Sequence, residues 1–95
     1  MIVDSDAVHD YLRVGSDPTD AELIESLITA AEVRLETFIG TTLAELIYES
    51  DALPEPLTRA ICMDVAAHYF SRLNPELPDA YFDAIGPWRA WSFGA

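Results

Sequence analysis

The segment from Leu57 to Leu73 restricts the fold of this chain more than any other part of the sequence. If this segment is helical, its apolar side chains lie on nearly every side of the helix. A helix of this kind has to be covered on most sides, either within its own domain or partly by neighbouring molecules. The apolar residues that give the pattern are Ile61, Met63, Val65, Ala66, Ala67, Tyr69 and Phe70. We therefore expect this helix at the centre of a small bundle.

An amphipathic helix lies upstream of this segment. Thr19 and Glu22 have the spacing of a capping box, and Asp17-Pro18 offers an alternative start. Gly40 marks the end of the helix. Apolar residues recur between these signals at alternating steps of four and three: Ile24, Ile28, Ala31, Leu35 and Phe38, with Leu27 alongside. The pattern predicts a helix that buries one face.

Shorter elements fill the first half of the chain. Cap candidates at Asp4 and Ser5 precede a short helix that places Val8, Tyr11 and Leu12 on one face. The stretch "TTLAELIYESDA" favours a short helical turn followed by a loop. The prolines of "LPEP" suit the first turn of the helix that follows.

The last quarter of the chain is divided by prolines. Asn74-Pro75 ends the long apolar helix, and a short helix is expected from about Asp79 to Ile85, broken by Gly86-Pro87. We therefore divide the chain into a helical domain, 1–87, and an aromatic tail, 88–95. The predicted fold class is all-α, a small compact bundle of about four to five helices.

The charge of the chain limits its partners. The 95 residues carry a formal net charge of −12, and all five basic residues are arginines, without a lysine. A body this acidic repels free nucleic acid, so direct DNA binding is not expected. One cysteine cannot form an intramolecular disulfide and fits a reducing compartment. Neither a signal peptide nor an apolar stretch long enough to span a bilayer is expected.

One group of residues resembles the start of a reactive site. Asp64 and His68 stand one turn apart on the predicted helix, close to Cys62. A metal site needs three or four ligands, and no further residue at a motif spacing completes this one. The glycines are isolated, so there is no phosphate-binding loop. We therefore expect a helix-surface hydrogen bond or ion pair beside a buried thiol, no metal, no cofactor and no enzymatic activity.

Glutamates form a second stripe along the amphipathic helix: Glu22, Glu25, Glu32 and Glu36. The stripe lies about 120° round the helix from the apolar one, at about 100° per residue. It is either an ordinary solvated face, a docking face for arginines of a partner, or a surface kept negative so that DNA does not adhere.

The tail combines three aromatic side chains with an arginine: Trp88, Arg89, Trp91 and Phe93. Such residues dominate the energetics of protein interfaces. The rings either fold back to complete a thin core or dock on a partner. The Gly86-Pro87 break favours docking, because it frees the tail from the preceding helix.

Taken in order, these segments resemble the head–tail connector (adaptor) proteins of tailed bacteriophages. The matching pieces are "VHDYLRV", "SDPTDAELIESLITAAEVRLETFIGTTL", "LPEPLTRAICMDVAAHYFSR" and "LPDAYFDAIGPWRAWSF". The resemblance covers nearly the whole chain. Longer members carry extra strands after the position of "IGTTL", and these are missing here.

The resemblance implies a helical subunit of a ring, twelvefold by this resemblance, under the portal of the virion. The ring would extend the DNA channel, let DNA pass without specific binding, and offer a platform for a tail or stopper protein. Trp88, Arg89 and Trp91 would contact the portal or a neighbouring subunit. The protein would stay in the host cytoplasm during assembly and then lie at the head–tail interface.

Two other functions fit parts of the sequence. An acidic decoy that mimics DNA would use the net charge and the glutamate stripe, but it has little use for the aromatic tail or the all-round apolar helix. A small metal-dependent enzyme would need more ligands than Cys62, Asp64 and His68 provide. DNA competition and metal analysis of the purified protein would test these two alternatives.

Overall fold

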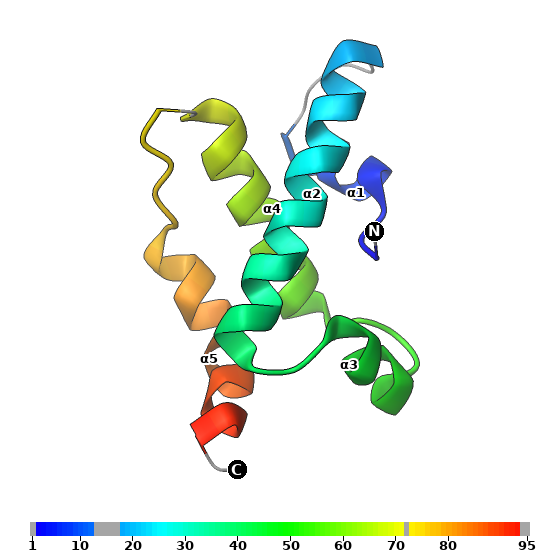
Figure 1. Ribbon diagram of the computed structural model, residues 1–95, viewed down its shortest axis with the longest axis vertical. Coiled ribbons are helices and arrows are strands. Elements are labelled where there is room, and N and C mark those ends of the chain that lie inside the picture. The colour runs from blue at the N-terminus through cyan, green and yellow to red at the C-terminus, as the bar shows by residue number, and fades with distance from the viewer. Residues whose placement is uncertain (1, 13–17, 72, 94–95) are drawn as a thin grey trace.

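Five helices follow one another along the described parts of the chain (Figure 1). They are α1 (Ser5–Leu12), α2 (Pro18–Ile39), α3 (Leu43–Ser50), α4 (Glu55–Phe70) and α5 (Asp79–Phe93). The computed structural model describes the backbone of residues 2–12, 18–71 and 73–93, and their side chains apart from those of 18–20, 49–50 and 89–93. The predicted all-α fold is confirmed. None of these helices is long and apolar enough to cross a membrane.

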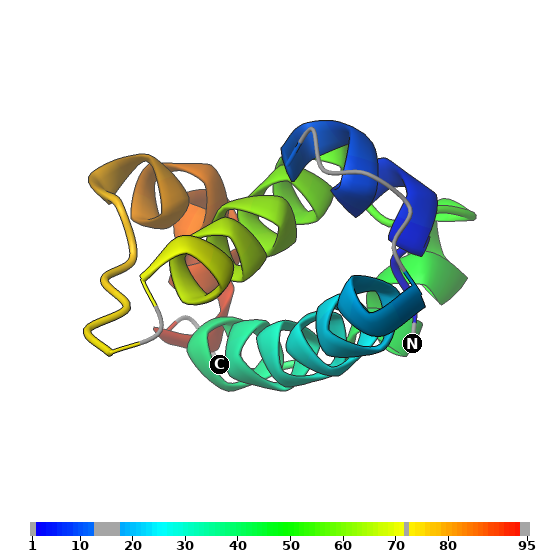
Figure 2. The same ribbon diagram turned by 90° about the horizontal axis from the view of Figure 1, so that it is seen from above.

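Helix α4 lies at the centre of the bundle, as its sequence predicts. It packs against α2 on one side and lies between α1 and α5, which Figure 2 shows from above. Ile61 and Val65 on α4 have no exposed surface, and Leu57 and Ala60 are equally buried. Burial of such apolar side chains is the main favourable contribution to folding. The position of α4 therefore accounts for the apolar residues on its buried sides.

Helix α2 begins at the second of the two predicted starts. Pro18 is its first residue, where the missing N–H of a proline has no intrahelical partner to lose. The predicted apolar residues face the core, with Ile24, Ile28, Ala31 and Leu35 fully buried. Gly40 ends the helix with a φ of 78°, a left-handed conformation that glycine adopts without strain.

Helix α3 is longer than the expected turn. Thr42 caps it, since its side-chain oxygen accepts a hydrogen bond from the N–H of Glu45. Leu43 and Leu46 are buried and hold the helix on the core. Asp51 ends it in the left-handed region with a φ of 65°. The side-chain cap and the two anchors extend the predicted turn into a helix of eight residues.

The prolines of α4 and α5 have different effects. Pro56 lies in the first turn of α4, as predicted. Helix α4 ends at Phe70, earlier than the predicted Leu73, because Ser71 leaves the helical conformation while its N–H still donates to the carbonyl of Ala67. In α5, Pro87 lies inside the helix.

The predicted break at Gly86-Pro87 is therefore wrong. A residue before proline normally avoids the helical conformation because its Cβ meets the proline ring. Gly86 has no Cβ, so this clash is absent and the helix continues to Phe93. A Cβ built at Gly86 would meet no neighbouring element within 4 Å, so packing does not require the glycine there. The proposed boundary between residues 87 and 88 falls within a helix.

Candidate docking surfaces

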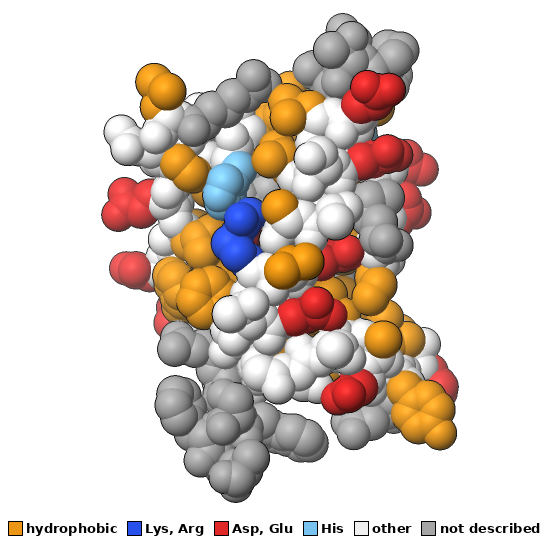
Figure 3. All heavy atoms as spheres, in the orientation of Figure 1, with side chains coloured by type: hydrophobic (Ala, Val, Ile, Leu, Met, Phe, Trp, Pro, Cys, Tyr) orange, Lys and Arg blue, Asp and Glu red, His pale blue; other side chains and the backbone are white. Residues whose placement is uncertain are grey.

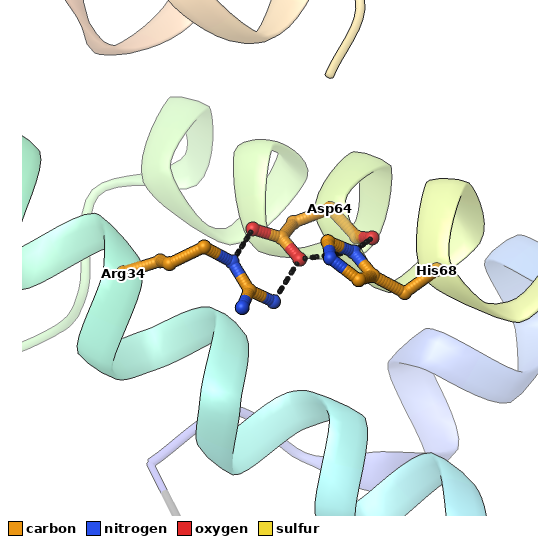
Figure 4. A network of polar contacts seen from close by, with 3 residues as sticks. All are labelled: Arg34, Asp64 and His68. Carbon is orange, nitrogen blue, oxygen red and sulfur yellow. Dashed lines mark hydrogen bonds and ion pairs between the residues drawn. The ribbon is translucent and has the colours of Figure 1, made fainter. Parts of the chain in front are cut away.

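A polar network joins α2 to α4 (Figure 4). Arg34 donates from Nε to Oδ2 of Asp64 at 2.9 Å and from Nη2 to Oδ1 at 2.7 Å. His68 Nδ1 lies 3.0 Å from the same Oδ1 and 2.9 Å from the backbone oxygen of Asp64. The Asp64 side chain is fully buried, whereas that of Arg34 is 36% exposed. Two parallel bonds to one carboxylate fix both the distance and the rotation of α2 on α4.

The sequence-based interpretation of Asp64 and His68 needs a correction. We expected an interaction on the helix surface, but Asp64 is buried, and its main partner is Arg34, thirty residues away. A buried charge requires a partner, so an aspartate within an apolar helix was the available signal for this contact. The hydrogen bonds to Asp64 raise the pKa of Arg34, so the arginine stays charged. The network is a structural clamp.

The neighbouring reactive groups are buried and protonated. Burial raises the pKa of the Cys62 thiol, which makes it a poor nucleophile. Burial, and then the negative charge of Asp64, raise the pKa of Tyr81 to about 12. Among residues 2–12, 18–71 and 73–93, no group of three or more histidine, cysteine, aspartate or glutamate side chains is placed to hold a metal ion.

The glutamate stripe divides into two pairs with different roles. Glu32 is only 7% exposed, and its Oε2 accepts hydrogen bonds from the N–H groups of Ile2 and Val3, both at 2.7 Å. Glu36 accepts the N–H of Leu43 at 2.9 Å, which holds the start of α3. These two carboxylates bind the chain's own backbone.

The other two glutamates of the stripe, Glu22 and Glu25, are exposed. They are the members of the stripe that are open to a partner. Figure 3 shows acidic side chains in patches along both margins of the visible face and in its lower half, with basic and histidine side chains meeting near the centre. The acidic surface is therefore distributed along several elements and is not confined to one stripe of α2.

The aromatic tail begins inside α5. Trp88 is half-buried and packs against the hydrophobic core, so this ring takes part in the fold. The backbone of the next five residues continues the helix. The side chains of Arg89, Trp91 and Phe93 lie outside the described residues, and their role in docking stays a prediction.

A largely apolar groove lies on the side of α4 that faces away from α2. At about 100° per residue, Met63, Ala66 and Ala67 lie roughly 120° to 160° round the helix from Ile61. Sequence reasoning did not locate this groove, although the apolar residues all round α4 were a signal for it. The residues that line it are Tyr11, Met63, Ala66, Ala67, Glu76, Pro78 and Ala80.

A comparison with protein families gives a match over most of the chain. The model of the phage gp6-like head-tail connector protein family matches residues 6–89, which is most of the chain. No curated protein and no solved structure shows a significant match. The family is a structural one whose members are not enzymes, which agrees with the prediction from the sequence. The chain belongs to the phage gp6-like head-tail connector protein family.

Proposed function

We propose that this protein is the subunit of a ring that attaches beneath the portal of a tailed phage. The ring extends the DNA channel and gives the next tail or stopper protein a surface to bind. The observation that carries this proposal is the family match over residues 6–89. The five-helix fold of the described residues agrees with it, since the matched region takes in almost all of them.

The charge of the molecule supports a role as a DNA conduit. Tight binding to DNA requires basic side chains that neutralise phosphates, and each such contact slows a sliding strand. The chain has a net charge of −12 and no lysine. Both arginines with described side chains are paired with acids: Arg34 with Asp64, and Arg59 with Glu55 at 3.0 Å. An acidic wall of this kind lets DNA pass without specific binding.

Two regions are proposed to contact partners. The aromatic tail, with Trp88 at its base and Arg89, Trp91 and Phe93 beyond, contacts the portal or a neighbouring subunit. The exposed glutamates of α2, Glu22 and Glu25, face the channel or a neighbouring subunit. Glu32 and Glu36 support these contacts indirectly, through the backbone bonds that they accept.

The same geometry weakens the alternative of a DNA-mimic decoy. A decoy presents carboxylates at phosphate-like positions on its surface, and two of the four stripe glutamates are bound to the chain's own backbone. A competition assay separates the two functions. A decoy displaces DNA from basic host proteins, whereas a connector leaves that DNA bound.

The direct test of the proposed function uses purified portal rings of the same phage. We expect the full chain to bind the portal, and native mass spectrometry to give a fixed number of copies per portal ring. The family resemblance implies twelve. A variant ending after Trp88 keeps the indole side chain that packs on the core and removes the rest of the tail. A full chain that does not bind the portal at all would overturn the proposal.

A further inference from the structure

The groove behind α4 has a floor of small and flexible side chains. Met63, Ala66 and Ala67 form this floor, and Tyr11 and Pro78 stand on either side of it. Small residues let another chain approach the helix closely, and methionine adapts to the shape of what it contacts. Among the described residues that line the groove, Glu76 is the single charged one, and it is exposed. The groove therefore suits an apolar segment that carries one positive charge.

The end of this chain has that composition. Of the 17 acidic residues, none lies after Asp83. Residues 89–95, "RAWSFGA", contain two aromatic residues and one arginine. In a protein with a net charge of −12, this is a segment that can approach an acidic surface without repulsion.

The chain cannot place its own tail in its own groove. Ala80 borders the groove near the start of α5, and Phe93 is thirteen residues further along the same helix. At 1.5 Å per residue, the two positions are about 20 Å apart. Figure 1 shows α5 running from its start at mid-height to the C-terminus at the lower end of the molecule. A tail that fills the groove has to come from another molecule.

We propose that the α4 groove receives the C-terminal segment of a second copy of this chain, with Arg89 of one copy facing Glu76 of the next. The proposal rests on the ring function given above and names the contact between its subunits. A cyclic assembly needs two different complementary surfaces on each subunit, and the tail and the groove are such a pair. The contact repeats from copy to copy until the ring closes.

Cross-linking tests the contact directly. Ala80→Cys places a thiol at the groove, and Ser92→Cys places one in the tail. Within one chain these positions are about 18 Å apart along α5, so a shorter bismaleimide joins them only between copies. The native Cys62 is 5% exposed and stays unreactive. We expect a ladder of linked subunits, both in concentrated protein and on portal rings.

The matched control moves the groove cysteine to another face. Thr29 is exposed on α2, and Thr29→Cys with Ser92→Cys keeps the same number of thiols. We expect this pair to cross-link about tenfold less, because no contact holds the two thiols together. The wild-type chain, with Cys62 alone, reports any background reaction.

Charge reversal tests the proposed ion pair. Glu76→Arg or Arg89→Glu alone brings like charges together, and we expect either change to lower the cross-linked fraction about tenfold. Both changes in one chain restore opposite charges at every contact, and we expect the ladder of cross-linked subunits to form again. Glu45→Arg makes the same change of charge on α3, at an exposed position that does not line the groove, and is expected to leave the ladder intact.

The outcomes separate this contact from the portal-binding function. The tail-in-groove contact would be overturned if Thr29→Cys and Ala80→Cys, each combined with Ser92→Cys, cross-linked equally. It would also be overturned if no ladder formed in concentrated protein or on portal rings. If the portal is still bound by the full chain in that case, the proposed function stands without it. A double charge reversal that fails to rescue the ladder, while circular dichroism shows the wild-type helical content, would equally contradict the contact.

Discussion

The two sides of α4 are both mainly apolar but lie in different environments. Towards α2, Ile61 and Val65 are fully buried, and Asp64 is clamped by Arg34. On the opposite side, Met63, Ala66 and Ala67 are half-buried, and Phe70 is 64% exposed. The side towards α2 is covered by other parts of the same chain, and the opposite side is partly exposed to solvent.

This difference shows how a helix divides its apolar surface between folding and assembly. The side facing α2 contains a charged pair, which has one low-energy arrangement and so fixes the helices in register. The open side has no such pair among the described residues, and its apolar surface can accept a partner without breaking an existing contact. A small acidic protein can in this way fold alone and still keep apolar area for a subunit interface.

Placing the same charge on the two sides is the strongest way to test this comparison. Ile61→Asp buries an unpaired carboxylate, which costs several kcal/mol and is comparable with the whole stability of a domain this size. We expect that variant not to fold. Ala67→Asp places the carboxylate in the open groove, where water reaches it, and we expect a folded protein that no longer assembles.

Circular dichroism and urea unfolding measure the folding of both variants, and native mass spectrometry measures their assembly. A stable, assembling Ile61→Asp protein would show that α4 is peripheral. An Ala67→Asp protein that assembles normally would show that the open side is not an interface.

The clamp between α2 and α4 predicts an unequal effect of removing its two partners. Arg34→Met leaves the fully buried Asp64 without its main counter-charge, and we expect a loss of about 3 kcal/mol. Asp64→Leu leaves an arginine that already reaches water, and we expect a loss of about 1 kcal/mol. The double variant should be more stable than Arg34→Met alone. Urea unfolding at pH 7 measures all three, and equal losses from the two single variants would contradict this account.

Much of the fold could be predicted from the sequence, because most of its signals are local. Periodic apolar residues in α2, the glycine at residue 40 and the prolines before α4 act within a few residues of their own position. The failure at Gly86-Pro87 has a local reason too. Glycine and proline each usually end a helix, but a glycine placed before the proline removes the clash that the proline ring would cause with a Cβ.

The contacts between distant segments could not be predicted in the same way. Glu32 was placed on an acidic face, but its Oε2 accepts hydrogen bonds from the backbone N–H groups of residues 2 and 3, which no periodicity connects to α2. Arg34 was not linked to Asp64 for the same reason. The spacing of charges along a helix predicts which side chains share a face, but not what packs against that face.

The two halves of the glutamate stripe differ enough to be separated by one substitution each. Glu32→Ala removes the acceptor of two backbone N–H groups, and that of Val3 is buried, so we expect a loss of about 2 kcal/mol. Glu25→Ala changes an exposed side chain, and we expect less than about 0.5 kcal/mol. Thermal unfolding followed by circular dichroism compares them. Equal stabilities of the two variants would mean that Glu32 is an ordinary surface residue.

The smallest effect is expected at Tyr81, where α5 meets the buried clamp. Its pKa is raised to about 12 in the folded protein, so the folded state keeps the phenol proton more tightly than the unfolded chain, whose tyrosines titrate near 10. The resulting stability is fully present below pH 10 and is lost as the pH rises towards 12. The raised pKa of Cys62 lowers stability in the same direction from about pH 9.

Tyr81→Phe should leave stability at pH 7 nearly unchanged, because the buried hydroxyl has no hydrogen-bond partner within the described residues. Above pH 10, the variant should lose less stability than the wild type in urea unfolding, and what loss remains should be reduced by Cys62→Ala. An identical alkaline loss in wild type and Tyr81→Phe would show that the phenol titrates alike in the folded and unfolded states.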